Sequence, residues 1–392
     1  MGNVDSGKTT LTCVLSCPSG INDDGRGALR EKVFNFTHEK ENGRTSSIGH
    51  EIIGFDKDGS QVSSAKFKDP LTAKKKATWP EIVAGSSRIA QLIDLCGHEK
   101  YLKTTMFGLS GLYPHYCMLV VGANMGVSRM TREHLGITQG LKIPMFIVVT
   151  KIDLAPATVY AETIATLNKI LKGAFCNLKP VVVKDAKNLD KIAEMIPSRS
   201  VCPIFPVSNV SGDGIELLKQ FISKLPVYDP QAIAEEDGNF IKGSSAALED
   251  LVESEFVVDS TYNVKNVGFV VGGTVTKGEV VLNSTLMMGP DKNGTFKGVL
   301  VKGIQENRVD IASAKRGQTV TILIKSVNKN QTFKFTRGAF KKGMTLLGVN
   351  MTKAAAMQKK GGQVNPSQVL EQLCVREFEA EVKILHHATS IK

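Results

Sequence analysis

The chain of 392 residues is long enough for two or three domains that each bury a core, and its 42% hydrophobic and 22% charged residues are typical of a globular protein. No apolar run reaches the ~18 residues of a membrane span, and no basic-then-apolar signal opens the chain, so neither a membrane protein nor a secreted one is expected. The seven cysteines form no C-x-x-C pair, which favours a reduced, cytoplasmic setting, and the net charge is +11.

The chain opens with a phosphate-binding motif: Gly2 to Thr9 matches G-x-x-x-x-G-K-[ST]. In such a loop the backbone N–H groups surround the phosphates, Lys8 adds a positive charge and the Thr9 hydroxyl can hold Mg²⁺. Apolar residues recur at helical spacing over 11–15, so a helix is expected whose positive N-terminal end points at the anion. For this motif alone, an ordinary glycine turn before a helix is the alternative.

A loop of this kind normally follows a buried strand, and here only Met1 precedes Gly2. Residues 1–228 are therefore predicted to form a nucleotide-binding G domain whose first strand is missing. We expect that the sequence starts late, rather than that the fold lacks its central strand.

The next segment, 20–57, is mostly polar, and we expect a long loop with a short helix near Ala28 to Phe36. Within it, 43–47 reads Gly-Arg-Thr-Ser-Ser, where Thr45 can bring a second Mg²⁺ ligand over the terminal phosphate. A plain turn is the alternative. The five lysines of 58–77 indicate an exposed insertion.

A strand is predicted over Arg88 to Leu95, and it ends in a D-x-x-G motif formed by Asp94 and Gly97. Nucleotide hydrolysis needs a carboxylate for the Mg²⁺ water shell, a glycine N–H that senses the γ-phosphate, and a side chain that orients the attacking water. His98, directly after the motif, suits the last role. Taken singly, the motif is short and a lone histidine is more often structural.

Two continuous apolar runs, 117–122 and 144–149, predict buried parallel strands covered on both faces. The second ends in Thr-Lys-Ile-Asp at 150–153. In a guanine site the Asp153 carboxylate accepts from the ring N–H and the exocyclic amine, while the Lys151 stem lies over the base. Adenine has an acceptor where guanine has the ring donor, so this motif selects GTP and disfavours a P-loop kinase.

A short strand over 204–207 leads into Ser-Asn-Val-Ser-Gly at 208–212. Helices are predicted over 131–141, 157–172 and 217–225. Four loop motifs thus stand in order, three of them directly after predicted strands, and the carboxyl ends of parallel strands share one edge of a sheet, where such sheets bind ligands.

The pattern changes after Pro226. Residues 229–254 are acidic and polar and predict a linker, whereas 255–352 show short β-branched segments broken by glycines, which predict a small β-barrel. Residues 353–376, rich in Ala, Lys, Gly and Gln, predict a second linker or insertion. Residues 377–392 are expected to form the first strand of a truncated further domain.

Positive charge is concentrated over 277–360, with 16 Lys or Arg against 4 Asp or Glu. A solvated lysine-rich face is one explanation. A concentrated excess in one segment favours a polyanion partner such as RNA.

Together these features resemble the GTP-binding protein 1 and 2 family of translational GTPases, relatives of elongation factors Tu and 1A. The resemblance rests on residues 3–5, 41–47, 97–105, 150–153, 272–274 and 385–389. It implies an α/β P-loop NTPase G domain with a mostly parallel sheet, followed by a translation-factor-type β-barrel. It also implies GTP and GDP as ligands, Mg²⁺-dependent GTP hydrolysis, and cytoplasmic work on the ribosome, aminoacyl-tRNA or RNA decay, without membrane or DNA partners.

By position, the resemblance also implies a set of site residues. The phosphates would be held by Asn3, Val4, Asp5, Ser6, Gly7, Lys8, Thr9, Thr10 and Gly97, Mg²⁺ by Thr9, Thr45 and Asp94, the attacking water by His98, and the base by Thr150, Lys151, Asp153, Leu154, Ser208, Asn209 and Val210. Two residues depart from the elongation factors: Cys96 replaces a proline and Thr150 an asparagine. The alternative function is a truncated, non-catalytic RNA- or protein-binding relative.

Overall fold

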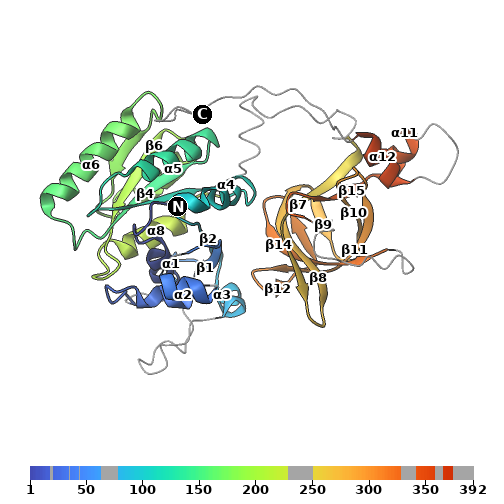
Figure 1. Cartoon of the computed structure of the whole chain (residues 1–392), viewed down its shortest axis with the longest axis horizontal. Helices are drawn as coiled ribbons and strands as arrows, with labels where there is room; N and C mark the ends of the chain where they lie inside the picture. The colour runs from blue at the N-terminus through green and yellow to red at the C-terminus, as the bar shows by residue number, and fades with distance from the viewer. Residues whose placement is uncertain are drawn as a thin grey trace. The chain divides into compact units, whose positions relative to one another are not determined.

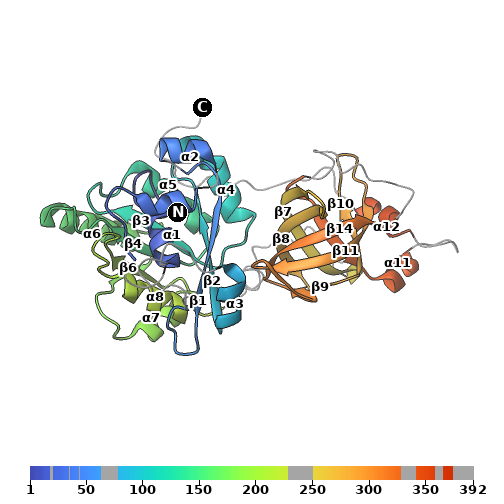
Figure 2. The same cartoon turned by 90° about the horizontal axis from the view of Figure 1, so that it is seen from below.

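The computed structural model describes residues 1–17, 21–34, 36–43, 45–62, 78–227, 250–327, 341–357 and 365–373. These residues divide into two compact units, one formed mostly by residues up to 227 and the other mostly by residues from 250 on (Figures 1 and 2). None of the helices in the described ranges is long and apolar enough to cross a membrane. The predicted final strand at 377–392, most of the first linker and most of the insertion at 58–77 lie outside the described residues.

The first unit combines helices with two sheets. Its helices are α1 (Lys8–Ser16), η1 (Ala28–Lys32), α2 (Thr37–Asn42), α3 (Trp79–Gly85), η3 (Glu99–Tyr101), α4 (Leu102–Ser110), α5 (Arg129–Gly140), α6 (Ala157–Lys172), α7 (Leu189–Met195) and α8 (Ile215–Lys224). Its strands are β1 (Gly49–Phe55), β2 (Arg88–Asp94), β3 (Cys117–Gly122), β4 (Met145–Thr150), β5 (Lys179–Val182) and β6 (Val201–Pro206). β3, β4, β6 and β5 form a parallel sheet in that order, and β1 pairs with β2 in antiparallel fashion.

Alternate residues of β3 and β4 face opposite sides of the parallel sheet and so build two hydrophobic cores. Val120, Phe146 and Val148 belong to a core shared with α1, α7 and α8. Leu119 and Ile147 belong to another, shared with α4, α5 and α6. Figure 1 shows α5 and α6 on one side of β4 and β6, with α1 and α8 on the other. The predicted α/β G domain with a parallel sheet is confirmed.

The start of the chain lies along the free edge of β3. The N–H of Val120 donates to the Met1 carbonyl at 2.7 Å, and the Met1 amino group donates to the Met118 carbonyl at 2.8 Å. Gly2 continues this contact as a parallel bridge to Val120. The phosphate-binding motif therefore leaves the sheet edge where the end of a preceding strand is expected.

The prediction of a long loop over 20–57 was wrong for its last part, because residues 49–55 form β1. The predicted short helix near 28–36 is a 3₁₀ turn, η1, followed by α2. β1 contains two glycines, which weaken its local β pattern. At Gly54 a Cβ would lie 1.9 Å from Ser86 Oγ, so α3 packs directly on the strand backbone. The strand is stabilised by pairing with β2 and by the cover of α3. The sequence of 49–55 alone indicates neither contact.

The second unit is the predicted β-barrel, which is confirmed. β10, β15, β7, β8, β14 and β11 pair in that order, and β10 also pairs with β11, so the ring closes. Its strands are β7 (Val252–Val264), β8 (Gly268–Lys277), β9 (Glu279–Val281), β10 (Thr285–Gly289), β11 (Lys297–Glu306), β12 (Val309–Asp310), β13 (Ser313–Lys315), β14 (Thr319–Ser326) and β15 (Thr345–Val349). Closure removes the exposed strand edges that an open sheet would leave.

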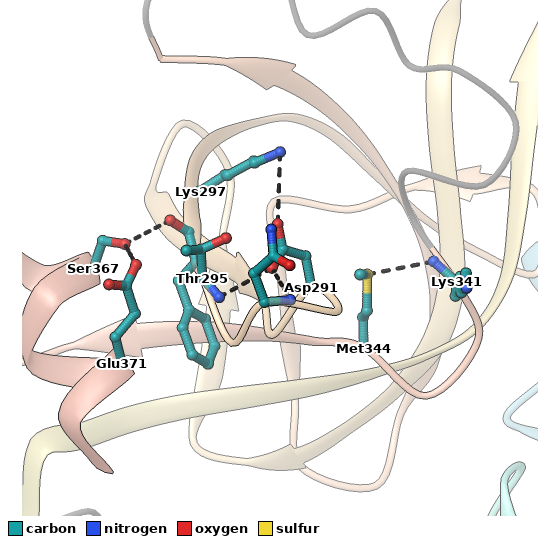
Figure 3. Close-up of polar contacts among 9 residues, drawn as sticks. Asp291, Thr295, Lys297, Lys341, Met344, Ser367 and Glu371 are labelled. Carbon is teal, nitrogen blue, oxygen red and sulfur yellow. Dashed lines mark hydrogen bonds and ion pairs between the residues drawn. The ribbon is translucent and has the colours of Figure 1, made fainter. Parts of the chain in front are cut away.

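The segment predicted to be a second linker or insertion, 353–376, is partly helical in its described residues. α11 (Met351–Met357) and α12 (Pro366–Leu373) stand beside the barrel (Figure 2). The Ser367 hydroxyl bonds to the Phe296 carbonyl at 2.7 Å and to the Glu371 carboxylate at 2.8 Å (Figure 3). The helices share a small core with the barrel, formed by Leu251, Val252, Met287, Phe296, Leu347, Ala354, Val369 and Leu370. The barrel thus supplies the surface against which Ala354, Val369 and Leu370 are buried.

The turn between β10 and β11 supports this contact. The Asp291 carboxylate accepts from the N–H groups of Asn293 at 2.8 Å and Thr295 at 3.1 Å, and Lys297 lies 4.0 Å away (Figure 3). These contacts order the turn that presents the Phe296 carbonyl to α12.

Candidate active site

The phosphate-binding motif wraps the N-terminus of α1. Gly7 caps the helix in the left-handed region, at φ 78°, without a side-chain hydrogen bond to the first turn. The N–H groups of that turn are therefore available to an anion, and the helix dipole favours one. The loop is formed by Asn3, Val4, Asp5, Ser6 and Gly7, and α1 begins with Lys8, Thr9 and Thr10.

The ammonium of Lys8 is held inside this loop. Only 9% of the residue is exposed, and Nζ donates to the Asn3 carbonyl at 2.7 Å. Burial lowers the pKa of Lys8, and the Asp94 carboxylate opposes this shift. A buried cation is costly unless an anion compensates it. A phosphate in the loop would supply that anion.

Three elements meet at the hydroxyl of Thr9. It donates to Asp94 Oδ2, at the end of β2, at 2.6 Å, and Thr45 Oγ1 lies 2.7 Å away. A hydroxyl carries one proton, and Thr9 directs its proton at Asp94. The Thr45 hydroxyl therefore donates to Thr9. Burial raises the pKa of Asp94, while Lys8 and Thr9 oppose the shift. The structure thus brings together all the residues predicted to hold the metal.

This donor set fits Mg²⁺. Two hydroxyl oxygens and one carboxylate are hard oxygen ligands, and Mg²⁺ in nucleotide sites takes one or two carboxylates and completes its shell with phosphates and water. In the described ranges, no group of three or more His, Cys, Asp or Glu side chains forms an all-protein cage. The site therefore suits a metal that is shared with phosphates.

The D-x-x-G loop passes directly over Lys8. At Gly97 a Cβ would lie 2.3 Å from Lys8 Nζ and 2.6 Å from the Gly2 carbonyl oxygen, so any side chain there would displace the phosphate loop. Beside it Cys96 is buried, and burial raises the pKa of its thiol to about 11, which keeps it neutral. Its Sγ lies 3.5 Å from the Ser47 carbonyl.

His98 follows Gly97 and is half-buried. Its Nδ1 accepts from the N–H of Lys100 at 3.1 Å, and its ring meets Tyr101 edge-on at 6.2 Å. A neutral ring that accepts at Nδ1 carries its proton on Nε2. His98 is therefore held in the tautomer that donates from Nε2.

Two residues predicted to contact the base also contact the phosphate loop. Thr150 is fully buried and donates to the Ser6 carbonyl at 2.7 Å. Asn209 Nδ2 contacts the Gly7 carbonyl at 3.5 Å, and its Oδ1 is a buried acceptor with no partner in the described part of the chain. Through Thr150, the loop after β4 and the phosphate loop lie at the same sheet edge.

The remaining base residues surround this junction. Lys151 adopts a left-handed conformation at φ 60°, and Asp153 is exposed. Leu154 and Val210 are 64% and 41% exposed. Ser208 Oγ orders the neighbouring loop by accepting from the N–H of Val210 at 3.2 Å. Exposed apolar side chains beside a carboxylate can cover the faces of a planar base.

Two carboxylates that sequence reasoning missed shape the surroundings. Asp23 accepts from the backbone N–H groups of Gly25 and Gly27, and its own N–H donates to the Asn209 carbonyl at 2.8 Å. An acidic residue just before a Gly-x-Gly turn was the available signal. The other carboxylate, Glu39, lies on α2, and Thr45 follows in the loop after that helix. No pattern in the neighbouring sequence indicates its role.

The geometry agrees with comparisons to known proteins. The family model described as the elongation factor Tu GTP binding domain matches residues 1–227. The chain belongs to this family. Its likeness to named relatives extends beyond the G domain and confirms the predicted resemblance to the GTP-binding protein 1 and 2 family of translational GTPases.

Three relatives illustrate the extent of the match. The chain is 38% identical to GTP-binding protein 1 of Xenopus laevis over 391 residues, which is 100% of this chain and 52% of that protein. It is 37% identical to GTP-binding protein 2 of Homo sapiens over 395 residues, covering 57% of that protein. The crystal structure of a bacterial selenocysteine-specific elongation factor matches with a TM-score of 0.55 at 22% identity, over 88% of this chain and 43% of that one. The chain thus spans about half the length of these relatives.

Proposed function

We propose that this chain binds GTP and GDP with Mg²⁺, hydrolyses GTP, and works as a cytoplasmic switch on an RNA-bearing partner, whether the ribosome, tRNA or RNA-decay machinery. The observation that carries the proposal is the meeting of Thr9, Thr45 and Asp94 within 2.6–2.7 Å, because it joins three separate chain segments around one hydroxyl. Such a junction is where a bound γ-phosphate and its metal order mobile loops in GTPases.

The residues divide the work by position. Lys8 and the N–H groups at the start of α1 hold the phosphates, while Thr9, Thr45 and Asp94 hold Mg²⁺. When bound, the metal neutralises charge that develops on the phosphates. His98 donates from Nε2 to orient the attacking water, since its Nδ1 is already engaged.

Nucleotide selectivity tests the proposal. In equilibrium titrations with GTP, GDP and ATP, we expect the guanine nucleotides to bind about 10²-fold or more tightly than ATP, because adenine would leave the Asp153 carboxylate unpaired. Asp153→Asn should lose most of that preference. Asp185→Asn, at an exposed aspartate after β5, is the matched control and should keep it. Equal affinity for GTP and ATP contradicts the assignment, and no nucleotide binding favours a non-catalytic RNA- or protein-binding relative.

The basic barrel supports the RNA part of the proposal. Lys302, Lys315, Arg316 and Lys325 are exposed on its strands and turns. Neutralising Lys315 and Arg316 to Gln should weaken RNA binding and reduce its salt dependence, with the log–log slope falling by about one for each RNA phosphate that is no longer neutralised. An unchanged slope would count against a phosphate contact at these positions.

A further inference from the structure

Glu39 on α2 is completely buried, although it belongs to one of the residue types least often found inside proteins. Its Oε1 accepts from the backbone N–H groups of Ser46 at 2.6 Å and Ser47 at 2.9 Å, and from their hydroxyls at 2.8 and 3.0 Å. Its Oε2 accepts from the N–H of Phe36 at 3.2 Å. One carboxylate thus ties both ends of the segment 36–47 together.

These contacts are strong ones. Burial raises the pKa of Glu39, but the hydrogen bonds from Ser46 and Ser47 outweigh burial and leave the pKa below its ordinary value, so the side chain is ionised. Hydrogen bonds to an ionised acceptor are about twice as strong as neutral ones. A charge placed inside the protein and surrounded by donors from one short segment orders that segment.

The ordered segment is the one that carries Thr45. Thr45 directly precedes Ser46, and its hydroxyl reaches Thr9 at 2.7 Å. Four residues later β1 begins, where Gly49 pairs opposite Asp94. Residues 45–48, the Thr45 segment, are therefore held between Glu39 on one side and β2 on the other. Consecutive Cα atoms are only about 3.8 Å apart, so holding Ser46 limits where Thr45 can lie.

We infer that Glu39 is the positioning residue that holds Thr45 over the nucleotide site and thereby sets how strongly the protein prefers GTP to GDP. This inference rests on the proposed function. The γ-phosphate is the part of GTP that GDP lacks, and Thr45 is placed to act there. A Thr45 segment that is already ordered loses less conformational entropy when GTP binds. Glu39 therefore favours the triphosphate and does little for the diphosphate.

Glu39→Gln tests this with a side chain of the same shape. Glutamine keeps one acceptor oxygen but loses the charge and the acceptor that faces Phe36. Titration with a non-hydrolysable GTP analogue should show about tenfold weaker binding, with GDP affinity changed by less than about twofold. The exposed Glu41→Gln on the same helix is the matched control and should leave both affinities unchanged. The double variant Ser46→Ala, Ser47→Ala, which keeps the backbone bonds, should shift the ratio in the same direction by less.

The outcomes separate the two ideas. If Glu39→Gln weakens the binding of the GTP analogue and of GDP equally, or leaves the ratio of the two affinities unchanged, the role of Glu39 is overturned. The proposal that the protein binds GTP would still stand. A wild-type protein that binds neither nucleotide overturns the proposed function itself. Thermal melting of each variant checks that it is folded, and if Glu39→Gln does not fold, the serine double variant decides, since an unchanged ratio there also overturns the role.

Discussion

The hydroxyl of Thr150 provides the sharpest test of how the motif after β4 supports the phosphate loop. It donates to the Ser6 carbonyl at 2.7 Å from a fully buried position. A peptide unit is planar, so the Ser6 carbonyl and the Gly7 N–H point in opposite directions, and holding the first aims the second. Thr150→Val keeps the side-chain volume nearly constant and removes the donor, which frees this peptide to rotate.

The expected loss follows from the cost of ordering that peptide. Fixing the backbone of one residue costs about 1–2 kcal/mol, and each 1.4 kcal/mol is about tenfold in affinity. Thr150→Val should therefore bind GDP and GTP alike about 5- to 30-fold more weakly in a fluorescent-nucleotide titration. Thr150→Ser keeps the hydroxyl and should stay within about threefold of wild type. If both variants melt as folded proteins and Thr150→Val binds nucleotide as wild type does, the reasoning is refuted.

Three further predictions address catalysis, backbone approach and pH. His98→Ala should slow single-turnover GTP hydrolysis by about 10²-fold while sparing nucleotide affinity, and an unchanged rate would exclude His98 as the residue that orients water. Gly97→Ala should abolish tight GTP and GDP binding in the same titration, because its Cβ would lie 2.6 Å from the backbone carbonyl oxygen of Gly2. Wild-type affinity would mean that the two loops can separate freely. Burial lowers the pKa of His134 from its ordinary value of about 6.5 to about 3. Between these two pH values the unfolded chain therefore binds a proton that the folded chain does not. The free energy of unfolding should then fall as the pH drops, by up to about 1.4 kcal/mol per pH unit. Between pH 6.5 and 4 the melting temperature should depend less on pH in His134→Leu than in wild type, whereas the exposed control His50→Gln should keep the wild-type dependence. An equally steep fall in His134→Leu would contradict this.

Local chemistry made much of the site predictable. Residue type and order were enough to name Lys8 and Thr9 after a glycine, the aspartate ahead of Gly97 and the carboxylate at 153 as candidates. What each of them binds stays a prediction. The parallel strands were equally visible, because strands covered on both faces are continuous apolar runs. The structure brings the Thr9 hydroxyl to 2.7 Å from Thr45 Oγ1 and 2.6 Å from Asp94 Oδ2.

Elements stabilised by distant partners were not predictable in this way. β1 contains two glycines and exists because β2 pairs with it and α3 covers it. α11 and α12 are short, and the barrel supplies the remaining surface of their core. Both were predicted as loop or linker, since local patterns do not record what a segment will pack against.

The sequence by itself determined which chemical groups this protein has at its nucleotide site and on which loops they lie, because glycine, lysine and carboxylate patterns specify local backbone shape and charge. Only the tertiary structure decided how those loops are held. Thr150 supports the phosphate loop from 144 residues away, and Glu39 holds the serines that follow Thr45. The physical reason is that a buried hydroxyl or carboxylate gains its role from the donors and acceptors that folding brings to it, and their identity is not written in the neighbouring sequence.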